Sequence, residues 1–97
     1  MKKVIITGSS RGIGRAIAIN LARAGYDPVL HCVKNRDALK SVADEIRSLG
    51  ATGDILQFDI ADRAATQAAL TAWVEANGAP FGVVLNAGIA DDAPFPG

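Results

Sequence analysis

The feature of this sequence that most constrains its fold is a group of three glycines between an apolar segment and an amphipathic one. The stretch VIITGSSRGIGRAIA begins with a short apolar strand, expected at about Lys3 to Ile6, and continues with apolar residues at helical spacing. Gly8, Gly12 and Gly14 lie at the junction. Glycine permits a sharp turn and a close approach to the main chain, so this junction predicts a strand–loop–helix unit.

Short apolar strands and amphipathic helices continue to alternate along the chain. The sequence predicts further strands at about Pro28 to Val33, at about Asp54 to Phe58 and in the run FGVVLNAG, residues 81–88. Such alternation is typical of a parallel sheet covered by helices, and right-handed crossovers give the strand order 3-2-1-4. The predicted fold class is therefore α/β, a doubly wound parallel sheet of the Rossmann type with helices on both faces.

The three predicted helices have recognisable boundary residues. Gly25 is expected to end the first helix in a left-handed conformation. Asn35 is the predicted N-cap of the second helix, which ends at Gly50. Asp62 is the predicted N-cap of the third helix, which Gly78 follows. The apolar faces are Ile13, Ala16, Ile17, Leu21 and Ala24 in the first helix, Leu39, Val42, Ala43, Ile46 and Leu49 in the second, and Ala65, Ala69, Leu70, Trp73 and Val74 in the third.

The glycine loop suits a ligand that carries phosphate. Its second glycine leaves space for a pyrophosphate beside the backbone, and its third lets the helix pack closely against the strand. The helix that begins near Gly12 offers unpaired N–H groups and the positive end of its dipole, and Ser9 and Ser10 can add hydroxyl donors. The spacing is G-x-x-x-G-x-G, and the alternative interpretation is a tight turn that binds nothing.

These motifs together resemble the short-chain dehydrogenase/reductase family. TGSSRGIG, the acidic DIAD at residues 59–62 and NAG at residues 86–88 follow one another in the family's order on the expected elements. The resemblance implies contacts to a dinucleotide from Gly8, Gly12, Ile13 and Gly14 at the pyrophosphate, from Asp59 and the Ile60 backbone at the adenine, and from Asn86, Ala87 and Gly88 at the riboses.

The end of the second predicted strand bears on the choice between NAD(H) and NADP(H). An NAD site usually has an acidic residue about twenty positions after the glycines, but Cys32 and Val33 stand at this place. The basic residues nearby are Arg11, Lys34 and Arg36, which a 2′-phosphate would attract. We therefore expect NADP(H), with Arg11 as its main cationic contact. The alternative is that all three are solvated surface charges.

The resemblance also implies hydride transfer between a carbonyl and an alcohol, assisted by a serine, a tyrosine and a lysine four residues after that tyrosine. Tyr26 is the only tyrosine, and Leu30 stands four residues later, so we expect no catalytic residue in this chain. The apolar run Val83 to Leu85 would leave an unprotected sheet edge. Residues 1–97 are therefore interpreted as the N-terminal part of a single dinucleotide-binding domain, inactive alone.

The stretch NAGIADD resembles 3-oxoacyl-[acyl-carrier-protein] reductases of fatty acid biosynthesis. This implies a 3-oxoacyl thioester on acyl carrier protein as substrate, and a homo-oligomer in the complete protein. Two alternatives stay open: an alcohol dehydrogenase of the same family that acts on another small molecule, or a dinucleotide-binding module without catalysis. Asp91 and Asp92 are interpreted as part of a solvated loop.

Composition argues against several other functions. Ten basic and ten acidic residues cancel, which speaks against a nucleic-acid or membrane partner. Cys32 is the single cysteine, expected to be buried, and no apolar run suits a signal peptide or a membrane span, so the expected location is the cytoplasm. No metal site is expected. His31, the only histidine, is interpreted as structural or as lining the adenine side of the site.

Overall fold

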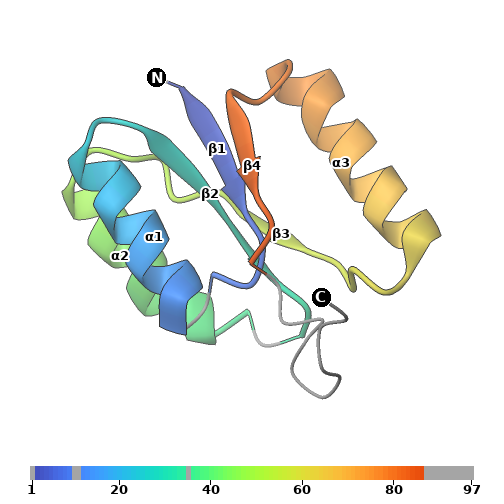
Figure 1. The fold of residues 1–97 in the computed structure, drawn as a ribbon, viewed down its shortest axis with the longest axis horizontal. Helices are drawn as coiled ribbons and strands as arrows, with labels where there is room; N and C mark the ends of the chain where they lie inside the picture. Colours follow the sequence, from blue (N-terminus) through green and yellow to red (C-terminus); the bar gives the residue numbers. More distant parts are fainter. Residues whose placement is uncertain (1, 10–11, 35, 87–97) are drawn as a thin grey trace, which may run out of the picture.

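Strands and helices alternate along residues 2–9, 12–34 and 36–86, the part of the chain that the computed structural model describes (Figure 1). The elements are β1 (Lys3–Ile6), α1 (Gly12–Arg23), β2 (Asp27–Cys32), α2 (Ala38–Ser48), β3 (Ile55–Gln57), α3 (Arg63–Asn77) and β4 (Gly82–Val84). The strands form one parallel sheet in the order β3-β2-β1-β4, which confirms the predicted topology.

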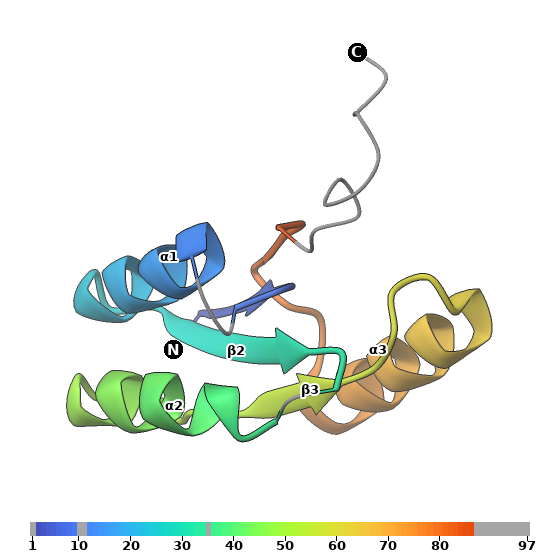
Figure 2. The same cartoon turned by 90° about the horizontal axis from the view of Figure 1, so that it is seen from below.

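The helices cover both faces of the sheet, as predicted. Figure 2 shows α1 and α2 on one side and α3 on the other. Successive side chains of a strand point to opposite faces of the sheet, and the side chains of β1 follow this alternation. Val4 and Ile6 pack beneath α1 and α2, whereas Ile5 packs with Val29 and Trp73 beneath α3. Trp73 is therefore a core residue, as the sequence predicted.

The two helical layers are not equally well packed. In α2, the four apolar residues Leu39, Val42, Ala43 and Ile46 are all buried, as predicted. In α3, Trp73 is the one buried residue, and Val74 is 41% exposed. The predicted burial of Val74 is therefore wrong, and so is that of Ile13, Ala16, Ala24 and Leu49, which are also exposed. In α1, the buried side chains are instead those of Ala18 and Ala22.

The second strand begins one residue earlier than predicted, at Asp27, and ends before Val33. Asp27 pairs in register with Lys3 of β1, and the Lys3 ammonium lies 2.9 Å from the Asp27 carboxylate. This ion pair lets a charged residue enter a buried strand. β3 and β4 are shorter than predicted, and part of the predicted fourth strand, residues 87–88, lies outside the described residues.

The helix boundaries follow the predictions in part. Asp62 caps α3, because its side chain accepts a hydrogen bond from the Ala65 N–H. Gly25 follows α1 with a positive φ of 95°, as predicted. Asn35 lies outside the described residues, and the N-cap position of α2 is held by Asp37, whose side chain makes no capping bond. The prediction of an Asn35 cap is therefore wrong.

Candidate functional site

The carboxyl ends of the four strands meet at one edge of the sheet, because all four are parallel (Figure 1). The strand order reverses between β1 and β4, and ligands of α/β sheets bind at such a reversal. Thr7 connects the two strands there. Its N–H and hydroxyl both donate to the Val84 carbonyl, at 3.0 and 3.2 Å, and its hydroxyl oxygen accepts from the Asn86 N–H at 2.8 Å.

Gly8 is held on both sides at this reversal. Its N–H donates to Nδ1 of His31 at 3.0 Å, and its carbonyl accepts from the Asn86 amide nitrogen at 3.3 Å. Its φ of 64° lies in the left-handed region, which glycine adopts without strain. The N–H of Gly8 is thus used within the protein. What Gly8 offers a ligand is the absence of a side chain.

Ser9 does not supply the hydroxyl donor that the sequence suggested. Its side chain is fully buried and bonded to the backbone of His31. The Ser9 oxygen accepts from the His31 N–H at 2.7 Å and donates to the His31 carbonyl at 3.3 Å. The Ser9 N–H also donates to that carbonyl, at 3.1 Å. Ser9 therefore extends the pairing of the first two strands, and its expected role as a hydroxyl donor to phosphate is wrong.

His31 joins the glycine loop to the end of β3. It is fully buried, on the same face of β2 as Val29. Because Nδ1 accepts from Gly8, the proton of the neutral ring is on Nε2, which donates to the Phe58 carbonyl at 2.8 Å. Burial lowers the pKa of His31, although the Phe58 carbonyl opposes this shift. These contacts favour the structural interpretation of His31 over a place lining the adenine.

The first turn of α1 faces the same edge with unused donors. Among the described residues, the N–H groups of Gly12 and Ile13 have no acceptor, as is usual at a helix start. Ile13 is 72% exposed, so its side chain does not cover them. A Cβ at Gly14 would overlap the Gly8 carbonyl and lie 2.6 Å from Nδ2 of Asn86. The helix start can therefore take an anion, such as a pyrophosphate, against bare backbone.

Asp59 and Ile60 follow β3 at this edge. The exposed Asp59 carboxylate accepts from the Ala61 N–H at 2.9 Å, which fixes its orientation. The hydroxyl of Thr66 donates to the Asp59 carbonyl at 3.2 Å and ties the segment to α3. A fixed, exposed carboxylate can accept a hydrogen bond from an amino group.

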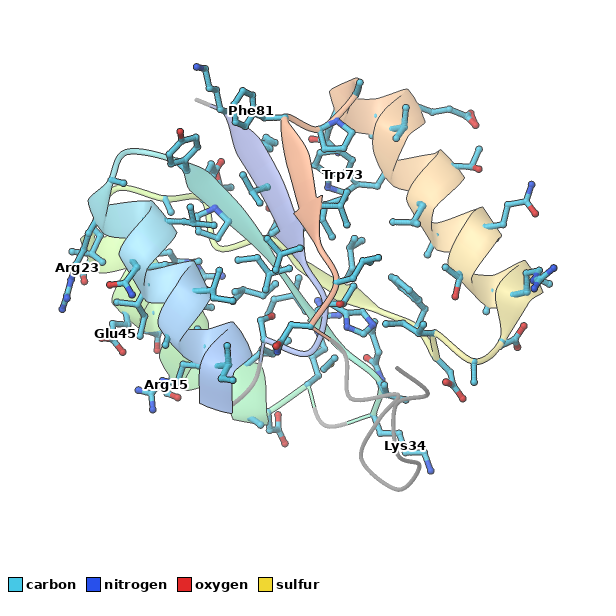
Figure 3. All side chains as sticks on the ribbon, viewed as in Figure 1. Arg15, Arg23, Lys34, Glu45, Trp73 and Phe81 are labelled. Atoms are coloured by element: carbon cyan, nitrogen blue, oxygen red, sulfur yellow. The ribbon has the colours of Figure 1, made fainter. Side chains whose placement is uncertain are left out.

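Four predicted site residues lie outside the described part of the chain: Ser10, Arg11, Ala87 and Gly88. Of the other predicted basic contacts, Lys34 is exposed just after β2 (Figure 3). Arg36 lines a cavity of about 510 Å³ with Arg47 and Trp73 along β3. The structure thus places Arg36 beside the outer strand β3.

The described residues contain no group of three or more His, Cys, Asp and Glu side chains that could hold a metal ion. Cys32 is buried, as predicted, and burial raises the pKa of its thiol. In the same part of the chain, no helix has the length and apolar character needed to cross a membrane.

Sequence reasoning gave a structural role as one of two interpretations of His31 but did not find its partners, and it gave no role to Thr7. The signal for His31 was present, since a polar side chain stands in the apolar run PVLHC of a central strand. A buried polar group must find partners, and both ring nitrogens of His31 do. What the sequence does not contain is the identity of those partners, because Gly8 and Phe58 come from two other strand ends.

Comparison with known proteins gives a consistent result. The family model for short chain dehydrogenase matches residues 2–96. The 3-oxoacyl-[acyl-carrier-protein] reductase FabG of Aggregatibacter actinomycetemcomitans is 52% identical over 93 residues, which cover 96% of this chain and 38% of that protein. The chain thus spans well under half the length of this relative.

Two solved structures are also similar, each with a TM-score of 0.76 and 33% identity. One is a short-chain dehydrogenase/reductase variant from Serratia marcescens, with 91% of this chain and 36% of that chain covered. The other is an alcohol dehydrogenase from the archaeon Thermococcus sibiricus complexed with 5-hydroxy-NADP, with 86% of this chain and 35% of that chain covered.

Proposed function

Because the chain belongs to the short-chain dehydrogenase family, we propose that it forms the dinucleotide-binding part of an NADP(H)-dependent oxidoreductase that reduces a carbonyl group. The observation that carries the proposal is the start of α1. The Gly12 and Ile13 N–H groups, which have no acceptor among the described residues, face the strand reversal, beside a Gly8–Gly14 contact that leaves no room for a Cβ on Gly14. The nicotinamide would supply the hydride.

We assign the pyrophosphate to the backbone of Gly12, Ile13 and Gly14, with Ser10 beside them. Gly8 contributes only close approach, because its N–H is bonded to His31. Asp59 and the Ile60 backbone would hold the adenine, since Asp59 is exposed and fixed at the end of β3. The amide of Asn86 is bonded to Gly8, so Asn86, with Ala87 and Gly88, would shape the ribose side of the site.

Preference for NADP(H) rests on the end of β2. No carboxylate follows this strand where a ribose 2′-hydroxyl would be bound, and the exposed Lys34 and the basic Arg11 are available to a 2′-phosphate. The alcohol dehydrogenase from Thermococcus sibiricus, whose structure contains an NADP derivative, supports the same choice.

The substrate proposed is a 3-oxoacyl thioester on acyl carrier protein, as in the name of the relative from Aggregatibacter actinomycetemcomitans. A second candidate is a small alcohol or ketone, favoured by the structural likeness to the alcohol dehydrogenase. Comparing NADPH oxidation with a 3-oxoacyl thioester and with simple ketones would separate the two.

We further propose that residues 1–97 are the N-terminal part of a single domain. Phe81, Val83 and Leu85 are 58%, 48% and 82% exposed along the β4 edge, where further strands would cover them. Tyr26 lies at the opposite edge of the sheet from the glycine loop, packed against Phe81, and is not a candidate general acid. The intact mass of the purified protein would test this: more than twice 10.0 kDa would mean a complete reductase, whereas 10.0 kDa would mean a fragment without the catalytic part.

The cofactor assignment is tested by charge reversal at Arg11. In Arg11→Glu, we expect the Kd for NADPH to rise at least about tenfold more than the Kd for NADH, because a charged contact to phosphate is lost. Arg23→Glu is the matched control, since Arg23 is in the last turn of α1, away from the loop (Figure 3). Equal effects of Arg11→Glu on both cofactors would refute the preference for NADP(H).

A further inference from the structure

His31 contacts the glycine loop and the end of β3 at once. Its two ring nitrogens are 3.0 Å from the Gly8 nitrogen and 2.8 Å from the Phe58 carbonyl. The Phe58 ring packs against the imidazole, with 4.4 Å between the centroids. This arrangement requires the neutral ring with its proton on Nε2, because Nδ1 must accept.

We propose that His31 is a positioning residue for cofactor binding, whose Nδ1 atom fixes the Gly8 amide and thereby the Gly8 carbonyl against which Gly14 of α1 packs. The proposal rests on the proposed function, since it concerns affinity for the same dinucleotide. His31 itself is fully buried, so its side chain would not contact a bound dinucleotide. It acts through Gly8, whose carbonyl is bonded to Asn86 and packs against Gly14.

The bond from Gly8 to His31 determines which amides remain for the phosphates. It turns the Gly8 N–H toward β2, and the Ser9 N–H is bonded to the His31 carbonyl. The described donors left at the helix start are then Gly12 and Ile13. Without an acceptor at Nδ1, the half-buried Gly8 N–H would have to turn toward water, which would move the Gly8 carbonyl against which Gly14 packs.

Protonation of His31 would remove that acceptor, so the position of the Gly8 amide depends on pH. Gly8, which bonds the ring, and Ser9, which bonds the His31 backbone, do not titrate. The titratable neighbours in the chain are Cys32, next to it on β2, and Asp59, which follows Phe58 and is exposed. Burial lowers the pKa of His31 from its ordinary 6.5, so the ring stays neutral at physiological pH. Loss of the contact is expected only below pH 6.5.

Two substitutions each keep one of the two ring contacts. In His31→Asn, the side-chain oxygen falls at the place of Nδ1 and can still accept from Gly8. In His31→Gln, the longer amide can donate to the Phe58 carbonyl but offers Gly8 no acceptor at that place. Both variants lose one hydrogen bond and do not titrate, so a purely structural role for His31 would affect them alike.

The experiment measures the Kd for NADP⁺, which is stable in acid, by calorimetry between pH 8 and pH 5 in the protein and both variants. At pH 8 we expect the Kd of His31→Asn to stay within about twofold, and that of His31→Gln to rise about tenfold, equivalent to about 1.4 kcal/mol. Below pH 6.5, the wild-type Kd should rise relative to the Kd of His31→Asn. NADP⁺ itself ionises equally in both measurements, so a difference between the two Kd values reports on His31. Wild-type affinity in His31→Gln would overturn the proposal.

The Gly8 amide gives a second measurement that needs no variant and no cofactor. Its ¹H–¹⁵N resonance should shift with pH along the titration of the His31 ring, because its acceptor is lost on protonation. If the chemical shift of the Gly8 amide does not change along the titration of His31, the proposal is overturned, even if both variants fail to fold. If NADP⁺ binds to no form of the protein but the Gly8 resonance titrates, the proposed cofactor is wrong and the link between His31 and the loop stands.

Discussion

Replacing Gly14 by alanine sets two effects of opposite sign against each other. Alanine is favoured over glycine within a helix by about 1 kcal/mol, because glycine loses more backbone freedom on folding. Gly14 is buried in the first turn of α1, with an ordinary helical backbone. If helix propensity decided the outcome, Gly14→Ala would stabilise the protein.

The surroundings of Gly14 predict the reverse. An added Cβ would overlap the Gly8 carbonyl, a backbone atom, and would lie 2.6 Å from Nδ2 of Asn86. Backbone cannot rotate away as a side chain can, so the helix would have to move off the loop. Such overpacking costs about 1–3 kcal/mol or more, and this site lies at the severe end because two partners are affected. We expect Gly14→Ala to lower the free energy of unfolding by about 2 kcal/mol after the gain in propensity.

Urea unfolding followed by the fluorescence of Trp73, the only tryptophan, would measure this change. Gly82→Ala is the matched control, because an added Cβ there meets no atom within 4 Å and the φ of Gly82 is not positive. Its free energy of unfolding should change by less than about 0.5 kcal/mol. A Gly14→Ala variant as stable as the wild-type protein, or more stable, would refute the close packing of α1 on the loop.

Two further substitutions test the framework of the sheet and of α3. Asp62→Ala should lower the free energy of unfolding by about 1 kcal/mol in urea titrations, since the Asp62 side chain caps the Ala65 N–H, whereas Asp44→Ala, an exposed change within α2, should cost less. Asp27→Ala should cost about 3 kcal/mol, because the buried carboxylate bonds Lys3 and both the N–H and the hydroxyl of Thr52. Burial raises the pKa of Asp27, but the bonds from Thr52 and Lys3 outweigh it, so the pKa lies below 3.8. Stability from Asp27 is then fully present above pH 3.8 and lost as pH falls through the lowered pKa, and an acid titration of Asp27→Ala as steep as that of the wild type would contradict this.

Local sequence patterns were enough to predict the topology of the sheet but not every strand and helix boundary. Strand alternation, the Asp62 cap and Gly25 are local signals, and the structure confirms them. The start of β2 depends on a partner distant in sequence, since Asp27 can be buried only because Lys3 and Thr52 surround it. No pattern within five residues of Asp27 contains that information.

In the candidate site, too, the features set by local sequence could be predicted, and those that depend on distant residues could not. The glycine loop and the acidic motif after β3 could be found from the sequence, because their spacing is fixed by a single strand–helix junction. The sequence could not show which hydrogen-bond donors of the loop remain available to a phosphate. Ser9 looked like a phosphate contact, and its hydroxyl is instead bonded to His31, a residue 22 positions away.

Segments that follow or belong to three parallel strands meet at one residue, Gly8, at this edge of the sheet. Gly8 follows β1, His31 of β2 accepts from its N–H, and Asn86, which follows β4, donates to its carbonyl. A glycine there is needed on two grounds: its φ of 64° disfavours a side chain, and its carbonyl packs where a Cβ of Gly14 would lie. Gly8 is therefore held in place before any ligand arrives, and the part of the ordering cost of cofactor binding that a flexible Gly8 would add is already met by the fold.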